Sequence, residues 1–203
     1  MRLILGSDLH GYLPASVPEG DLMILAGDIL PEEGIWDFIT NRLNPWLAKA
    51  PVKRTVLTWG NHDWPMPDLT MGVKSANVLV EQVIKIGGIK IYGSPWSLPY
   101  MRWAWMAPER TLAKIYQDIP KDVDVIVSHA PPYGWGDMNS KGEHWGSRRL
   151  RFRMEALPNL KLLVCGHIHE GYGRYGIVAN VSSVYNAEGR YIPRIDPWTV
   201  VDI

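Results

Sequence analysis

The chain has almost no cysteine and no excess of either charge. Its 203 residues include a single cysteine, Cys165, so no disulfide can form within the chain, and a reducing, cytoplasmic compartment is the expected location. The 21 basic side chains balance the 21 acidic ones, which removes the positive field that holds a protein on nucleic acid or on an anionic membrane. We therefore expect no stable nucleic-acid partner and no membrane partner.

Long hydrophobic stretches and phenylalanine are also scarce. Apolar runs such as residues 22–26 are far shorter than the roughly 18 residues that a membrane-spanning helix needs, and the N-terminus lacks the apolar stretch of a signal peptide. Two Phe stand against ten Trp and nine Tyr, so most aromatic rings carry a polar group that suits loops and ligand-binding walls. The length predicts a single domain, residues 1–203, that buries roughly 70% of its unfolded surface.

Short apolar runs rich in β-forming residues predict buried strands. They lie at residues 3–5, 22–25, 55–57, 123–127 and 160–164. Between the second and third runs, apolar residues follow helical spacing from Ile35 to Leu47, with Pro45 as a point of interruption. This strand-helix-strand order implies parallel pairing, and therefore a mixed α/β domain.

Further elements follow along the chain. A hairpin is expected from strands at 77–86 and 89–92, because Gly87-Gly88 between them tolerates positive φ. Helices are expected at 109–117 and 147–157, and short strands from residue 177 to the end.

Five of the predicted strands end in residue types that bind metals. Because the carboxyl ends of strands in open α/β sheets form one crevice, we expect these side chains to converge. Carboxylate, imidazole and amide donors without thiolate suit Mn, Fe, Zn, Co or Ni. The motifs contain five of the six histidines and read Asp8-Leu9-His10, Gly27-Asp28, Gly60-Asn61-His62-Asp63, His129-Ala130-Pro131 and Gly166-His167-Ile168-His169.

Each motif alone has a more common structural explanation. An isolated Asp or Gly-Asp usually caps a turn, and an isolated histidine is usually structural. Five such clusters at strand ends reverse that balance in favour of a metal site. The sixth histidine, His144, stands in a loop and is interpreted as a surface residue.

The ordered set of motifs from Asp8 to His169 resembles the signature of the calcineurin-like metallophosphoesterase superfamily. Segments 91–96, 129–132 and 166–173 are similar to its metallophosphoesterase-domain-containing branch of small phosphodiesterases. The resemblance implies an α/β fold, specifically a four-layer αββα sandwich of two mixed β-sheets flanked by helices. It also implies two divalent metal ions, with manganese favoured. The first ion would be held by Asp8, His10 and His169, the second by Asn61, His129 and His167, and Asp28 would bridge both.

The same resemblance assigns a catalytic role to His62, which would sit over the phosphate without binding metal. Two divalent ions against two carboxylates and a bridging hydroxide leave a charge of about +1, which attracts a phosphate ester. His62 suits protonation of the departing alkoxide, because the reference pKa of imidazole lies near neutral pH. Asp63 either orients or charges His62, or it is a simple loop cap.

The substrate is predicted less directly. Gly27-Asp28 lacks the following Asp-Arg pair of phosphoprotein phosphatases, and the third motif ends in Asp63 rather than Glu. These departures favour a phosphodiesterase acting on a nucleotide or another small diester. The nucleobase would stack on aromatic residues near the ligand motifs, namely Trp64, Trp96, Tyr133 and Trp135. The alternative is that these residues belong to the core or to a lid.

Three alternatives stay open at this point. A small-molecule phosphomonoesterase would need a cationic fork, for which Arg148, Arg149 and Arg174 are candidates. A nuclease would need a basic groove, which the neutral charge balance disfavours. A catalytically silent scaffold would have lost ligands, whereas every expected ligand is present. The sequence does not predict an oligomeric state.

Overall fold

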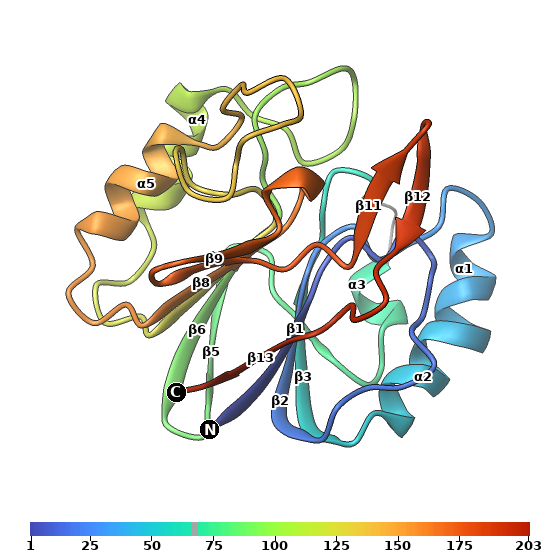
Figure 1. The fold of residues 1–203 in the computed structure, drawn as a ribbon. Coiled ribbons are helices and arrows are strands. Elements are labelled where there is room, and N and C mark those ends of the chain that lie inside the picture. The colour runs from blue at the N-terminus through green and yellow to red at the C-terminus, as the bar shows by residue number, and fades with distance from the viewer. Residues whose placement is uncertain (66–68) are drawn as a thin grey trace.

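The computed structural model describes residues 1–65 and 69–203. Two large β-sheets pack face to face (Figure 1). The first sheet has the order β13-β1-β2-β3-β4. Strands β1 to β4 pair in parallel, and β13 runs antiparallel to β1. Their bounds are β1 (Arg2–Gly6), β2 (Gly20–Ala26), β3 (Val52–Thr58), β4 (Asn77–Val78) and β13 (Thr199–Asp202).

The second sheet has the order β5-β6-β7-β8-β10-β9. Its four inner strands are parallel, and its two edge strands, β5 and β9, are antiparallel to their neighbours. The bounds are β5 (Gln82–Ile86), β6 (Ile89–Ser94), β7 (Val125–Ser128), β8 (Leu162–Cys165), β9 (Gly173–Tyr175) and β10 (Val178–Asn180). Leu5, Ile24 and Val56 of the first sheet share one buried apolar cluster with Val127 and Val164 of the second.

Helices cover the outer face of each sheet (Figure 1). On the first sheet these are α1 (Ile35–Phe38), a π-helical turn (Ile39–Leu43), α2 (Asn44–Lys49) and α3 (Leu69–Gly72); on the second they are α4 (Glu109–Gln117) and α5 (Arg148–Glu155). The predicted four-layer αββα sandwich is therefore confirmed. Within residues 1–65 and 69–203, no helix is long and apolar enough to cross a membrane.

Pro45 does not break the helix in which it lies. The segment from Ile35 to Lys49 is helical throughout, and the π-helical turn Ile39–Leu43 ends just before α2, whose first turn holds Pro45. A proline removes one backbone hydrogen bond and crowds the preceding turn, and the wider π turn accommodates both effects. The predicted interruption is thus a change of helix type.

The segment 77–86 forms two strands rather than the single strand that we predicted. Residues of β4 pair with β3 in the first sheet, whereas β5 pairs with β6 in the second. Glu81, between them, has φ 53° and redirects the chain. The hairpin itself is confirmed, because Gly87 and Gly88 have φ of 56° and 87° and close the Ile86–Ile89 pair. Apolar alternation predicts a strand but does not say which sheet receives it.

A third, two-stranded sheet follows β10. It consists of β11 (Val184–Ala187) and β12 (Arg190–Pro193), which pair antiparallel. In Figure 1 this red hairpin stands beyond the ends of the first sheet, on the side where the strand-end loops gather. The C-terminal short strands predicted from residue 177 are confirmed.

Candidate metal centre

The loops after β1, β2, β3, β7 and β8 carry all seven predicted metal ligands. Three of these strands belong to the first sheet and two to the second, and their parallel directions bring the loops to one edge of the sandwich. The five more deeply buried ligands, each at most 5% exposed, are Asp8, Asp28, Asn61, His129 and His169. His10 and His167 are half-buried.

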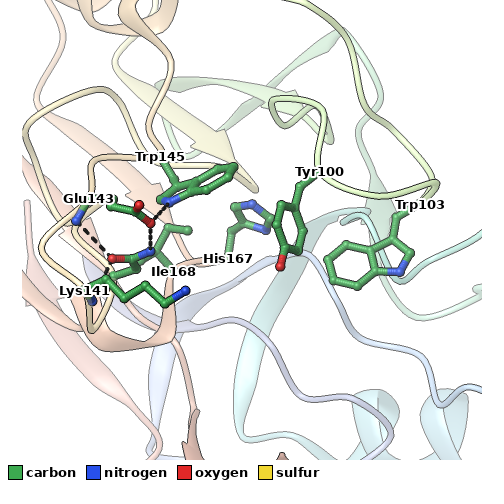
Figure 2. Close-up of a pocket in the computed structure, with 8 residues that line it drawn as sticks. Tyr100, Trp103, Lys141, Glu143, Trp145, His167 and Ile168 are labelled. Atoms are coloured by element: carbon green, nitrogen blue, oxygen red, sulfur yellow. Dashed lines mark hydrogen bonds between the residues drawn. The ribbon is translucent and has the colours of Figure 1, made fainter.

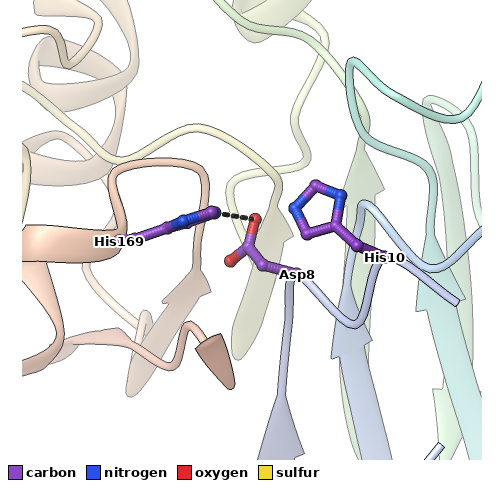
Figure 3. A group of neighbouring side chains, drawn as sticks. All are labelled: Asp8, His10 and His169. Atoms are coloured by element: carbon purple, nitrogen blue, oxygen red, sulfur yellow. Dashed lines mark ion pairs between the residues drawn. The ribbon is translucent and has the colours of Figure 1, made fainter. Parts of the chain in front are cut away.

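One group of ligands consists of Asp8, His10 and His169. Figure 3 shows the Asp8 carboxylate between the two imidazole rings. His169 Nε2 lies 3.5 Å from Asp8 Oδ1, and one ligand atom from each of the three residues lies within 4.8 Å of the others. Among the described residues, buried His10 Nε2 has no hydrogen-bond partner. A buried, unpartnered nitrogen is costly unless something binds it, so this group fits a metal ion.

A second group surrounds Asp28. Its Oδ2 lies 3.4 Å from His129 Nε2 and 3.9 Å from His10 Nε2, so this carboxylate reaches toward both sets of ligands. Asn61 Oδ1 lies 2.8 Å from His129 Nε2, and the His129 and His167 ring centroids are 5.0 Å apart. The donors are oxygen and imidazole nitrogen atoms, as expected for a divalent transition metal. Which ion each ligand holds stays a prediction.

The pKa values of these groups reflect burial and one ion pair. Burial alone would raise the pKa of Asp28, but the charge and hydrogen bond of His129 lower it far below the usual range; the pKa of Asp8 is lowered as well. Burial would lower the pKa of His129, yet the charge of Asp28 raises it to about 9. Burial lowers the pKa of His10 to about 4 and that of His167 to about 3. Hence, of the three histidines His10, His129 and His167, only His129 has a pKa above neutral, and its ring lies next to Asp28.

Four ligands have left-handed backbone conformations that non-glycine residues seldom adopt. Their φ angles are 56° at Asp8, 43° at His10, 52° at Asp28 and 67° at His167. Each such residue costs on the order of 1–3 kcal/mol and persists where the surroundings hold it, typically at functional sites. A backbone hydrogen bond of 2.9 Å from His10 to the Asp28 carbonyl supports this conformation. Four of the eight described non-glycine residues with positive φ are therefore proposed ligands.

Other groups hold the ligands in place. Ser182 Oγ donates to Asp8 Oδ2 at 2.6 Å, and His129 Nδ1–H donates to the Ala26 carbonyl at 2.9 Å. The second bond directs Nε2 of His129 toward Asp28 and Asn61. Sequence reasoning missed Ser182, because a serine after a short strand carries no motif.

Glycine precedes several ligands because a larger residue would not fit. A Cβ atom added to Gly60 would overlap the Asp28 carboxylate, and one added to Gly166 would overlap that of Asp8. The glycines of these motifs thus let the backbone approach the carboxylates closely.

His62 and Asp63 lie in the same loop but face different surroundings. The His62 ring centroid is 5.0 Å from that of His10 and 4.5 Å from that of Trp103, and its backbone N–H donates to Asp28 at 2.8 Å. In the described part of the chain, the Asp63 carboxylate accepts only from backbone N–H groups, those of Ile29, Leu30 and Gly60. Of the two alternatives for Asp63, the geometry favours the loop cap.

Comparison with known proteins decides the family. A family model described as calcineurin-like phosphoesterase matches residues 1–171. This chain belongs to the calcineurin-like phosphoesterase family. It is accordingly a metal-dependent phosphoester hydrolase by family, and members of the family generally bind two divalent metal ions.

Several relatives show how far the likeness extends. Human metallophosphoesterase domain-containing protein 1 is 29% identical over 100% of this chain and 71% of that protein. Probable rhamnogalacturonate lyase C of Emericella nidulans is 32% identical over 86% of this chain but only 18% of that protein. A UPF0046 protein of Caenorhabditis elegans is 29% identical over 78% of this chain and 48% of that protein. The chain therefore spans less than a fifth of the Emericella protein and about half of the nematode one.

A cavity opens beside His167 at the edge of this calcineurin-like metal centre. Figure 2 shows His167 between the rings of Tyr100 and Trp145. The Tyr100 ring centroid is 5.1 Å from that of Trp145 and 5.5 Å from that of Trp103. The remaining lining residues are Asn139, Lys141, Glu143 and Ile168. Sequence reasoning missed these aromatic residues, since they lie in two long loops without periodicity.

The aromatic residues singled out from the sequence lie elsewhere. Trp96 donates its indole N–H to Glu81 at 2.6 Å, Trp135 packs against the apolar core of the second sheet, and Tyr133 lies under the Arg148 guanidinium at 3.6 Å. In the described part of the chain, the lining of the cavity contains none of these three rings. Their stacking role stays a prediction, with packing as the alternative that these contacts favour.

His144 is exposed, as expected for a surface residue. Its ring is nevertheless held, because Nδ1 lies 2.8 Å from the carboxylate of buried Asp137. The same carboxylate accepts from the Gly146 backbone at 3.0 Å. This pair therefore organises the loop that carries one wall of the cavity.

Proposed function

We propose that this chain is a phosphodiesterase that hydrolyses a small diester, most specifically a nucleotide diester, with two divalent metal ions. The observation that carries the proposal is the position of the aromatic cavity directly beside the ligand His167. A phosphate bound at the metal centre would place one of its ester groups in that cavity. The physiological metal is proposed to be manganese, one of several ions that suit oxygen and imidazole donors.

The seven ligands fit such a centre, because they combine buried carboxylates with imidazoles that are neutral or would release their proton when a metal binds. Two bound ions would supply positive charge that attracts the phosphate and would lower the pKa of water toward neutral. The protein orients the ligands through Ser182, whose hydroxyl donates to Asp8, and through the backbone of His62, which donates to Asp28.

His62 supplies the proton for the leaving group in this proposal. Its ring is half-buried and lies against the rings of His10 and Trp103, so it lies beside the proposed ligands and is partly open to solvent. An imidazole there is suited to give a proton to the departing alkoxide. Asp63 contributes as a positioning residue, because its carboxylate binds the loops that carry Asp28 and Asn61.

The kind of cation near the site supports a preference for a diester over a monoester. A dianionic monoester is best bound by an arginine fork, yet within the described residues Lys141 is the cation of the cavity lining. Arg148 covers Tyr133, Arg149 is exposed on α5, and Arg174 donates to the Gly176 carbonyl. These contacts leave a phosphomonoesterase as the second candidate, and the neutral charge balance again disfavours a nuclease.

Side-by-side hydrolysis of bis-p-nitrophenyl phosphate and p-nitrophenyl phosphate tests the proposal. The protein is stripped of metal and manganese is then added back. We expect diester cleavage that requires the metal and exceeds monoester cleavage. Faster monoester cleavage would identify a phosphatase, and a metal-loaded protein inert on both esters would support the silent-scaffold alternative.

A further inference from the structure

The β11–β12 hairpin is a separate element attached to the metal centre. Its two-residue turn has positive φ at Glu188 (51°) and Gly189 (76°), the geometry of a tight hairpin. Arg194, just after β12, donates to the Ser182 carbonyl at 2.8 Å and to the His169 carbonyl at 2.9 Å. The guanidinium therefore ties the base of the hairpin to a loop that carries a metal ligand.

Tyr191 of this hairpin contacts three histidines of the site. Its ring stacks on His10, with centroids 3.8 Å apart and planes 7° from parallel. It meets the His169 ring edge to face at 5.5 Å. Its hydroxyl lies 3.4 Å from Nε2 of His62. One side chain thus touches the proposed proton donor and two proposed ligands of the first metal.

The His62 ring has few other restraints. In the described part of the chain, Tyr191 is its one hydrogen-bonding side chain, and the other aromatic rings next to it are those of His10 and Trp103. A misplacement of about 1 Å in a catalytic group costs on the order of 100-fold in rate. A group that donates protons in the reaction therefore needs a partner that sets the orientation of its ring.

We propose that Tyr191 is a positioning residue with two separate tasks. Its hydroxyl forms a hydrogen bond with Nε2 of His62 and sets the orientation of that ring, while its ring holds the plane of His10 by stacking. The first task rests on the proposed function, because it acts through the proton donor of the reaction. The second task concerns metal binding and is independent of the substrate.

Replacement of the hydroxyl alone tests the first task. Tyr191→Phe keeps the stacked ring, so we expect kcat for an alkyl phosphodiester to fall about tenfold, the size of one lost hydrogen bond, with KM within about twofold. The fall should be smaller for a p-nitrophenyl diester, because p-nitrophenolate leaves without a proton. Tyr185→Phe, the same change on the same hairpin, is the matched control and should leave kcat unchanged. Equal losses for both leaving groups would overturn the proposal.

A double-mutant cycle separates positioning from general structural damage. If Tyr191 acts through His62, Tyr191→Phe should have no further effect on kcat in the His62→Ala protein. Multiplicative losses in the double variant would show that the hydroxyl acts independently of His62, and would overturn the first task.

Two readouts do not depend on hydrolysis. In metal-free protein, the ring-nitrogen NMR shifts of His62 should change in Tyr191→Phe and stay unchanged in Tyr185→Phe; no change in either variant would overturn the first task. Tyr191→Leu, which removes the stacked ring, should weaken manganese binding several-fold in calorimetry, whereas Tyr191→Phe should not. Equal affinity in both would overturn the second task. If wild-type protein cleaves no ester while these shifts appear, the proposed function fails and the role of Tyr191 in placing the rings stands.

Discussion

At the scale of single residues, the acidic group and the basic group that matter most, Asp28 and His62, have different surroundings. Asp28 is 2% exposed and its carboxylate reaches toward His10 and His129. His62 is half-buried and lies beside the ligands rather than among them. Removal of the first should therefore damage the metal centre, whereas removal of the second should damage the proton transfer alone.

Alanine variants test this division. Asp28→Ala should lose both metals and all activity, because it removes the carboxylate shared by the two groups of ligands. His62→Ala should retain two metals and lose on the order of 10²–10⁴-fold in kcat, the usual contribution of a general acid. Metal content by mass spectrometry and kcat are the measurements, with Asp21→Ala, at a partly exposed carboxylate paired with Lys53, as control. Equal metal loss from both variants would contradict the division of roles.

The protonation of His129 predicts how metal binding depends on pH. Because its pKa is raised to about 9, His129 is protonated at pH 7 in metal-free protein, and a metal binds only the neutral imidazole. Metal binding at pH 7 should therefore release a proton, and affinity should rise from pH 7 to about pH 9. His10 and His167, with pKa values of about 4 and 3, are already neutral there. Calorimetry in buffers of different ionisation enthalpy measures the release; binding without proton release would contradict the ion pair with Asp28.

At the scale of elements, the strand ends build the metal centre and the long loops build the cavity. The ligands follow strands whose direction and packing bring them together. Tyr100 and Trp145 instead come from loops after β6 and β7, and their rings meet at 5.1 Å only because both loops fold over His167. The metal centre is accordingly recognisable as a pattern in the sequence, and the cavity is not.

Substitutions in these loops test the nucleotide subsite. Tyr100→Leu and Trp145→Leu should each raise KM for a nucleotide diester about tenfold or more, since stacking on one base contributes ~1–3 kcal/mol. KM for a small alkyl diester should stay unchanged. Trp36→Leu, which replaces a half-exposed indole on α1, is the control. A rise in KM after Trp96→Ala and Trp135→Ala, with none for the first two, would restore the sequence-based assignment.

At the scale of the whole molecule, sequence patterns predicted a mixed α/β domain with a ligand-bearing edge, because the ligand motifs follow apolar strands, whereas the sandwich of two sheets was implied by the family resemblance of the motif set. They did not predict that residues 77–86 divide between the two sheets, since alternation of apolar residues carries no information on the partner strand. Ser182 and Tyr191 were missed for a different reason. Both belong to the C-terminal region, where no motif marks them, and they reach the metal centre only through the packing of β10 and the hairpin.

A metal titration tests the central claim that two ions held at this edge make the chain a hydrolase. Manganese is added stepwise to metal-stripped protein, and bound metal and bis-p-nitrophenyl phosphate hydrolysis are followed together. We predict no hydrolysis without metal, binding that saturates at two ions per chain, and activity that rises with the occupancy of the second ion. Full activity in metal-free protein, or saturation of both binding and activity at one ion, would contradict the account.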